Sequence, residues 1–261
     1  MDARYRMPAR DGGGRRSQLR HPRPRARRPP ARALHARQMR AGPAGSAASR
    51  LVAVTIEGPA GPLEGLLQVR ETTPAIAAVV CHPHPLYGGT LHNKVVHRMA
   101  SALFDLGAAV LRFNFRGAGK SAGHHDRGIG ELEDARAALG FLSRRFPGAR
   151  RWVGGFSFGA WVAARLAASE PAIDRLILVA PPVSRSGFEV LRTSRVPKLI
   201  VQGTRDDLCP LEELEREYPT WAEPKQLIKI EGASHFFDRQ LGELKQILLE
   251  ALAGDSKGST S

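Results

Sequence analysis

Short, almost wholly apolar runs recur along this chain, and longer segments in which apolar residues are spaced as in a helix lie between them. Runs of this length suit strands that are buried on both faces. Their alternation with helices indicates an α/β fold, in which a parallel sheet is covered by helices. The expected buried strands are 76–81, 108–114, 151–155, 174–180, 197–202 and 226–230.

Two earlier runs, 51–57 and 63–70, alternate in polarity on either side of a Gly-Pro turn. This pattern predicts an antiparallel hairpin at one edge of the sheet, which then has eight strands, most of them parallel. Helical spacing between the strands predicts the helices that flank the sheet. The expected helices are 91–106, 129–145, 158–169, 211–218 and 237–253.

Charge divides the chain into two parts. Residues 1–50 hold 14 arginines, no lysine and two acids, so their formal charge is +12 of the +14 of the whole chain. Because this segment is also poor in apolar side chains, we predict a disordered extension over 1–50, one α/β domain over 51–253 and a flexible tail over 254–261. The arginines could alternatively form a patch for polyanions, but the near-neutral remainder lacks the basic excess of a nucleic-acid-binding domain.

Membrane insertion and disulfide bonding are both unexpected. No stretch of about 18 apolar residues occurs, which argues against a membrane span. Cys81 and Cys209 are the only cysteines, and two cysteines are too few for a disulfide framework. We therefore expect a cytoplasmic protein with two reduced thiols.

The sharpest chemical signal is the sequence Gly-Phe-Ser-Phe-Gly at 155–159, which lies where a predicted strand ends and a predicted helix begins. In that context G-x-S-x-G is typical of a nucleophile elbow, a strained turn that presents a serine hydroxyl at the edge of the sheet. Gly155 and Gly159 suit the close approach of strand and helix. Ser157 is therefore the candidate nucleophile, the alternative being a turn that only caps an ordinary helix.

A serine nucleophile needs a base and an acid that orients the base. Asp206 and Asp207 follow the seventh predicted strand, and His235 follows the eighth. These positions place all three at the carboxyl ends of strands, where Ser157 also lies. The loop after the sixth strand, 180–183, holds no carboxylate, so the acid is Asp206 or Asp207 and His235 is the candidate general base. Taken singly, the acids could be helix caps and the histidine a surface residue.

Acyl transfer also needs two N–H donors for the oxyanion of the intermediate. Phe158, directly after the serine, is the first candidate. The second should come from the loop after the strand at 76–81. Because Pro83 and Pro85 have no N–H, the backbone of His84 is the better donor in that loop.

Histidines offer a competing interpretation of the same region. His82 and His84, together with His124 and His125, could be ligands of a metal ion. Their spacing fits no common metal signature, and the serine arrangement needs no metal. No metal and no cofactor are therefore expected.

At this point the chain resembles the α/β-hydrolase superfamily, and within it a group of small, uncapped bacterial hydrolases related to dienelactone hydrolases and short-chain esterases. Beyond the serine motif, the resemblance rests on CHPHPLYGGT at 81–90, FNFRGAGKSAG at 113–123 and GELEDARAAL at 130–139, and it covers about residues 51–252. Dienelactone hydrolases use a cysteine nucleophile, whereas this chain has Ser157.

The resemblance implies an α/β-hydrolase fold without a large cap, because only residues 181–196 occupy the place where this fold inserts a lid. It also favours Asp206 as the acid, since the superfamily has a Gly-x-x-Asp turn after this strand. The implied enzyme is a carboxylesterase-like serine hydrolase that cleaves a small-molecule ester or related acyl bond through an acyl-serine intermediate. The expected pocket residues are Tyr87, Phe156 and Phe236. The alternatives are a peptidase or thioesterase of the superfamily and a non-catalytic ligand-binding module.

Overall fold

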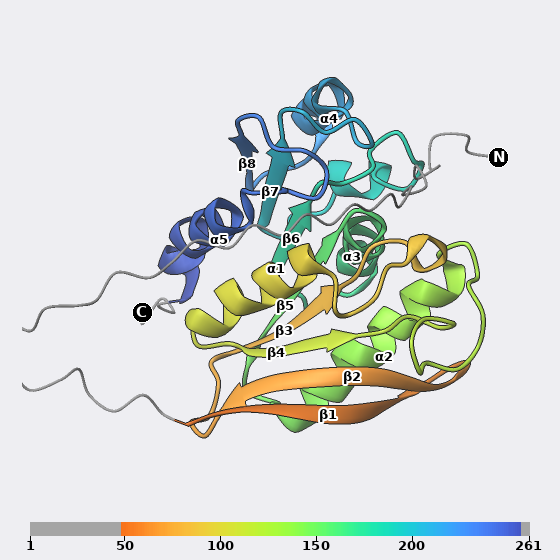
Figure 1. The fold of residues 1–261 in the computed structure, drawn as a ribbon. Helices are drawn as coiled ribbons and strands as arrows, with labels where there is room; N and C mark the ends of the chain where they lie inside the picture. The colour runs from red at the N-terminus through yellow and green to blue at the C-terminus, as the bar shows by residue number, and fades with distance from the viewer. Residues whose placement is uncertain (1–47, 257–261) are drawn as a thin grey trace, which may run out of the picture. The chain divides into compact units, whose positions relative to one another are not determined.

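The computed structural model describes residues 48–256, and these form an eight-stranded sheet in the order β1-β2-β4-β3-β5-β6-β7-β8 (Figure 1). β2 pairs antiparallel with both β1 and β4, and every other neighbouring pair is parallel. The predicted eight-stranded, mostly parallel sheet is therefore confirmed. The strands are β1 (Ser49–Gly58), β2 (Gly61–Arg70), β3 (Ile76–Cys81), β4 (Ala109–Phe113), β5 (Arg150–Phe156), β6 (Arg175–Val179), β7 (Lys198–Gly203) and β8 (Lys225–Ile230).

Helices cover both faces of the sheet (Figure 1). Alternate residues of the buried strands point to opposite faces, so that Val79 packs with the core under α2 and α3 while Val80 packs with the core under α1 and α5. Each face therefore has its own hydrophobic core, as a doubly covered parallel sheet requires. The helices are α1 (Lys94–Asp105), α2 (Ile129–Arg145), α3 (Phe158–Ser169), α4 (Leu211–Glu217) and α5 (Leu241–Ser256), with 3-10 turns η1 (Pro85–Tyr87), η2 (Glu189–Arg192) and η3 (Tyr218–Thr220).

Two helices begin later than their apolar spacing predicts. α1 starts at Lys94 rather than at 91, because the Asn93 side chain accepts hydrogen bonds from the N–H groups of Val95 and Val96 and so caps the helix. α5 starts at Leu241 rather than at 237. Phe237 and Arg239 have φ of 52° and 67°, and such left-handed residues interrupt a right-handed helix.

The domain edges also differ from the expected ones. β1 begins at Ser49 and α5 ends at Ser256, so regular structure extends slightly beyond 51–253 at each end. The remaining parts of the predicted extension over 1–50 and of the tail over 254–261 lie outside the described residues.

The segment between β6 and β7 is short and firmly packed, and no large cap is present within the described residues. Its one element of regular structure is the 3-10 turn η2. Phe188 stacks on Trp221 with ring centroids 5.9 Å apart, and Leu191 is fully buried. The indole N–H of Trp161 donates to the Ser186 carbonyl over 2.7 Å. These contacts anchor the segment to the main core.

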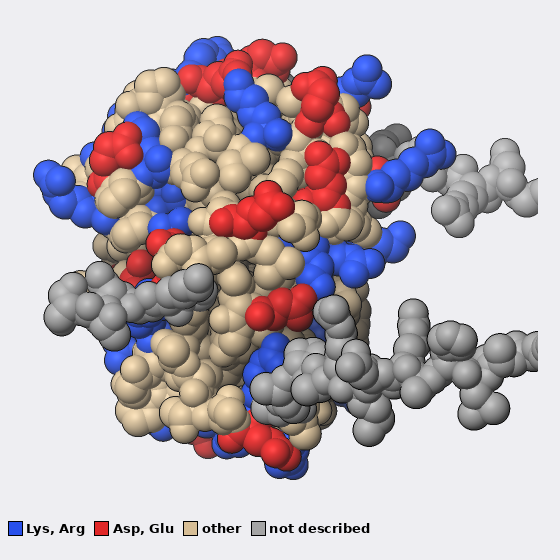
Figure 2. Space-filling model, turned by 90° about the vertical axis from the view of Figure 1, so that its left-hand side faces the viewer, with Lys and Arg blue, Asp and Glu red and all other residues tan. Residues whose placement is uncertain are grey.

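A hollow of about 800 Å³ lies at the end of the sheet opposite the carboxyl ends of the parallel strands. Residues 69–75 and 145–149 line it together with Arg50, and the first two segments lead into β3 and β5. None of the candidate site residues lines this hollow. Figure 2 shows one face of the molecule, on which acidic and basic side chains are interspersed, in keeping with the near-neutral charge of the chain after residue 50.

Candidate active site

Ser157 occupies a sharp turn between β5 and α3. Its φ of 54° and ψ of −120° are strained for a residue with a side chain. The turn is held on both sides, because the Ser157 N–H donates to the Val179 carbonyl over 2.9 Å and the Ser157 carbonyl accepts from Ala160 and Trp161. The geometry is that expected of a nucleophile elbow.

The two glycines of the motif are required by space. A Cβ atom on Gly155 would overlap the carbonyl of Gly159, and a Cβ atom on Gly159 would overlap the carbonyl of Cys81 at the end of β3. The predicted close approach of strand and helix at these glycines is therefore confirmed. The second contact also brings the start of α3 against the loop that follows β3.

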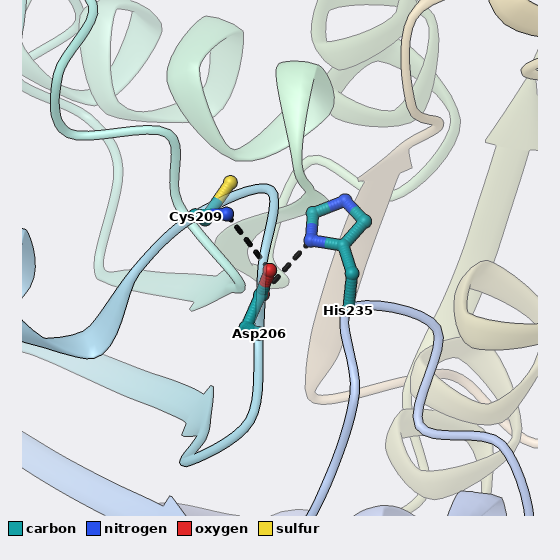
Figure 3. A group of neighbouring side chains, drawn as sticks. All are labelled: Asp206, Cys209 and His235. Carbon is teal, nitrogen blue, oxygen red and sulfur yellow. Dashed lines mark hydrogen bonds and ion pairs between the residues drawn. The ribbon is translucent and has the colours of Figure 1, made fainter. Parts of the chain in front are cut away.

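Asp206 and His235 lie in contact at the carboxyl ends of β7 and β8. The His235 Nδ1 and the Asp206 Oδ2 are 2.8 Å apart, and the two residues are 4% and 5% exposed (Figure 3). Asp207 is exposed. Of the two acids that the sequence leaves open, the structure thus pairs Asp206 with the histidine.

The Asp206 carboxylate has further partners that sequence reasoning missed. Its Oδ1 accepts from the N–H groups of Leu208 and Cys209 over 3.0 and 2.8 Å, and its Oδ2 accepts from Gln202 Nε2 over 3.0 Å. Gln202 is fully buried in β7. Two sequence signals could have identified these contacts. Gln202 is a polar residue inside an apolar strand, and an aspartate in a turn commonly accepts hydrogen bonds from the backbone N–H groups that follow it. The carboxylate is therefore fixed before any substrate binds.

Aromatic rings hold the imidazole of His235. The Phe156 ring centroid lies 4.9 Å from that of His235, and the Phe236 ring lies 5.1 Å from it on another side. Because Phe156 directly precedes Ser157, this packing places the imidazole beside the elbow. Phe236 is half-buried, whereas Phe156 is fully buried. Phe156 thus supports the histidine from the core and has no surface open to a substrate.

His82 fixes the loop after β3. Its Nδ1 donates to the Pro83 carbonyl over 2.6 Å and its Nε2 accepts from the Phe115 N–H over 3.0 Å. Burial lowers the pKa of His82 to about 4, which suits a neutral ring with one donor and one acceptor nitrogen. In a trans peptide the N–H points opposite to the C=O, so the N–H of His84 is directed away from the His82 ring.

The side chain of His84 joins a cluster of rings next to the elbow. Its ring centroid lies 4.8 Å from that of Phe158, 4.7 Å from that of Tyr87 and 4.6 Å from that of His125. Burial, and then the neighbouring His125 and Arg185, lower the pKa of His84 to about 4. Tyr87 is 45% exposed. The structure thus brings together three predicted site residues, His84, Tyr87 and Phe158.

The histidine set considered as a metal site is not assembled. Both ring nitrogens of His82 are already engaged by the backbone. Within residues 48–256, the one group of three histidine, cysteine or acidic side chains close enough to share a metal ion is Asp206, Cys209 and His235.

The same part of the chain holds no helix that is long and apolar enough to cross a membrane.

A family profile and a bacterial relative both match this chain. The profile of a family described as serine aminopeptidase, S33, matches residues 75–192. An uncharacterized protein of Rickettsia prowazekii is 36% identical over 208 residues, which are 76% of this chain and 87% of that protein.

Two solved structures share this fold over nearly their whole length. An α/β serine hydrolase homologue from Coxiella burnetii is 41% identical with a TM-score of 0.75, and the match covers 77% of this chain and 97% of that one. A serine hydrolase without a lid from Xanthomonas campestris is 37% identical with a TM-score of 0.72, over 77% of this chain and 93% of that one. With its elbow, its uncapped sheet and these relatives, the chain belongs to the α/β serine hydrolases, in the group that has no lid.

Proposed function

We propose that this protein hydrolyses small carboxylic esters through an acyl-serine intermediate, with Ser157 as nucleophile, His235 as general base and Asp206 as the acid that orients the base. The observation that carries the proposal is the contact of 2.8 Å between His235 Nδ1 and Asp206 Oδ2, with the imidazole packed beside the strained Ser157 turn. All the groups required are side chains, backbone N–H groups and water, so the proposed steps need no cofactor.

The first half-reaction transfers the acyl group to the enzyme. The Asp206 carboxylate accepts the Nδ1–H of His235 and so keeps the lone pair of the histidine on Nε2. Nε2 removes the proton of Ser157 as Oγ attacks the ester carbonyl. The tetrahedral intermediate then collapses, and the alcohol departs with the proton from Nε2. In the second half-reaction water replaces the alcohol, and its attack releases the acid and restores Ser157.

Two backbone N–H groups are proposed to stabilise the oxyanion. Phe158 is the first residue of α3, so its N–H has no acceptor within the helix. The N–H of His84 lies in the loop that packs against Gly159 and is oriented through the Pro83 carbonyl. Donors fixed in this way act on developing charge without having to reorganise.

The description of the matching family raises a second function, that of an aminopeptidase. Such an enzyme would bind the ammonium group of its substrate next to the scissile bond, a task for a carboxylate. The cationic Arg185 acts on the ring cluster beside the elbow. The carboxylate that also acts there, that of Glu131, is buried and already accepts hydrogen bonds from His125 Nδ1 and from the N–H groups of Asp126 and Gly128. We therefore favour the ester. The test compares kcat/KM for p-nitrophenyl acetate with that for alanine p-nitroanilide, and a preference for the anilide would reverse the choice.

The backbone of His84, and not its ring, is expected to matter for catalysis. The φ of His84 is −56°, which a proline can adopt. His84→Pro and His84→Ala both remove the ring, but only the proline variant removes the N–H. We expect kcat for the proline variant to fall about 10² to 10³-fold below that of the alanine variant, as when one oxyanion donor is lost. Equal values for the two variants, with matched melting temperatures, would remove His84 N–H from the mechanism.

Short acyl chains are expected to be preferred. The segment at 181–196 is anchored to the core through Phe188 and Leu191, so little apolar surface is left to cover a long chain. A groove that enclosed the chain would contribute about 0.8 kcal/mol, or roughly fourfold in kcat/KM, for each methylene. Across p-nitrophenyl esters from acetate to palmitate, we expect no such gain beyond about four carbons. A steady rise up to palmitate would indicate a lipase-like groove instead.

A further inference from the structure

Cys209 stands beside the Asp206–His235 pair, and the proposed hydrolysis makes no use of its thiol. The Cys209 Sγ, a carboxylate oxygen of Asp206 and a ring nitrogen of His235 all lie within 4.8 Å of one another (Figure 3). Cys209 is 4% exposed, and all three residues are buried. A sulfur, a nitrogen and an oxygen donor therefore converge at one point of the site.

This donor set suits a zinc ion. Zn²⁺ binds thiolate sulfur at about 2.3 Å and imidazole nitrogen or carboxylate oxygen at about 2.0 to 2.2 Å, in a tetrahedral arrangement. Neighbouring ligand atoms in such a site are about 3.3 to 3.7 Å apart. Since the three atoms already lie within 4.8 Å of one another, small side-chain rotations bring them to zinc-binding distances. Three protein ligands leave a fourth position for water.

Three hydrogen bonds hold the cysteine and the aspartate together, two of them through Gln202. The Cys209 N–H donates to Asp206 Oδ1 over 2.8 Å. Gln202 Nε2 donates both to the Cys209 carbonyl over 2.7 Å and to Asp206 Oδ2 over 3.0 Å. Much of the ordering that a metal site requires is thus present before the ion binds.

We propose that Cys209, Asp206 and His235 form an inhibitory zinc site. On binding, the Cys209 thiol gives its proton to solvent and its sulfur bonds to the ion. The Nδ1 of His235 bonds to the ion through its lone pair, and the imidazole proton moves from Nδ1 to Nε2 through solvent. One proton is released for each ion bound. With a proton on Nε2, His235 has no lone pair to accept the proton of Ser157, so hydrolysis stops until the metal is removed.

The binding test uses the full-length chain carrying Ser157→Ala, so that it does not depend on hydrolysis. Cd²⁺, a spectroscopic substitute for Zn²⁺, is titrated while the thiolate-to-metal absorption band in the ultraviolet is followed. We expect one ion per chain with a thiolate band, both lost when Cys209→Ala is added. The matched control is Cys81→Ala, which removes the other buried thiol and should leave band and stoichiometry unchanged.

The inhibition test uses the Ser157 enzyme and buffered Zn²⁺, with each rate taken relative to the zinc-free rate of the same variant. We expect inhibition that EDTA reverses, and a half-inhibiting Zn²⁺ concentration at least about tenfold higher for Cys209→Ala than for Cys81→Ala. If Cd²⁺ binding or Zn²⁺ inhibition is the same in Cys209→Ala as in Cys81→Ala, the metal binds to surface histidines instead, and the proposed site is wrong. Inhibition rests on the proposed function, but the Cd²⁺ titration does not. A protein that shows no hydrolysis but still binds Cd²⁺ through Cys209 would contradict the proposed hydrolysis and leave the proposed metal site intact.

Discussion

Ser157→Ala is expected to lower ester turnover by about a millionfold, because removing the nucleophile disables a triad that acts as one unit. Ser157 is 1% exposed and its backbone is held by hydrogen bonds to Val179, Ala160 and Trp161. Alanine keeps these backbone bonds, so the fold should survive and the loss should be chemical. The measurement is kcat for p-nitrophenyl acetate with the purified variant, together with its melting temperature.

Labelling with a fluorophosphonate provides an independent check of the same residue. The probe should modify Ser157 once per chain in the unmodified protein and should not modify Ser157→Ala. Ser184→Ala is a suitable control, since Ser184 is an exposed serine in the segment between β6 and β7, and this variant should keep both labelling and turnover. More than about a tenth of the original activity in Ser157→Ala would remove this serine from the mechanism.

Asp206→Asn is expected to lower kcat by about ten-thousandfold, because it imposes the wrong tautomer on His235. Asp206 Oδ1 accepts two backbone N–H groups, from Leu208 and Cys209. The amide oxygen of asparagine can take that place, which puts its NH₂ group where Oδ2 now faces His235 Nδ1. A donor at this position requires Nδ1 to be the acceptor, so the proton resides on Nε2 and the base is lost.

Asp207→Asn is the matched control for this substitution. Asp207 is the next residue, is exposed and undergoes the same change of charge, so its kcat should stay close to that of the unmodified protein. Measured side by side at one pH, the two variants separate loss of the oriented tautomer from loss of a negative charge near the site. A much larger loss in Asp207→Asn would reverse the assignment of the acid.

The order and type of the elements could be predicted because buried strands and amphipathic helices leave different periods in the sequence. The bounds of α2 and α3 agree with the predicted ones. The starts of α1 and α5 do not, since they depend on local chemistry that apolar spacing does not record. Asn93 caps the first helix by its side chain, and the left-handed Phe237 and Arg239 delay the second.

The candidate site was predictable where chain order and turn position constrain it, as for His235 and the aspartate pair. Residue spacing by itself left Asp206 and Asp207 open, because the two are neighbours and only the fold buries one of them. Gln202 and Cys209 were missed for a related reason. Gln202 stands out in the sequence only as a polar residue in an apolar strand, and its contact with Asp206, like that of Cys209, exists only once β7 has brought the turn into place.

The packing of Gly159 against the Cys81 carbonyl bears on how this enzyme can evolve. Backbone atoms, rather than side chains, set the start of α3 against the loop that is proposed to supply the second oxyanion donor. Substitutions at neighbouring side chains such as Tyr87 and Phe236 therefore leave that backbone contact in place. Substitutions can therefore accumulate singly at such positions without moving this contact, while position 159 remains closed to every residue except glycine.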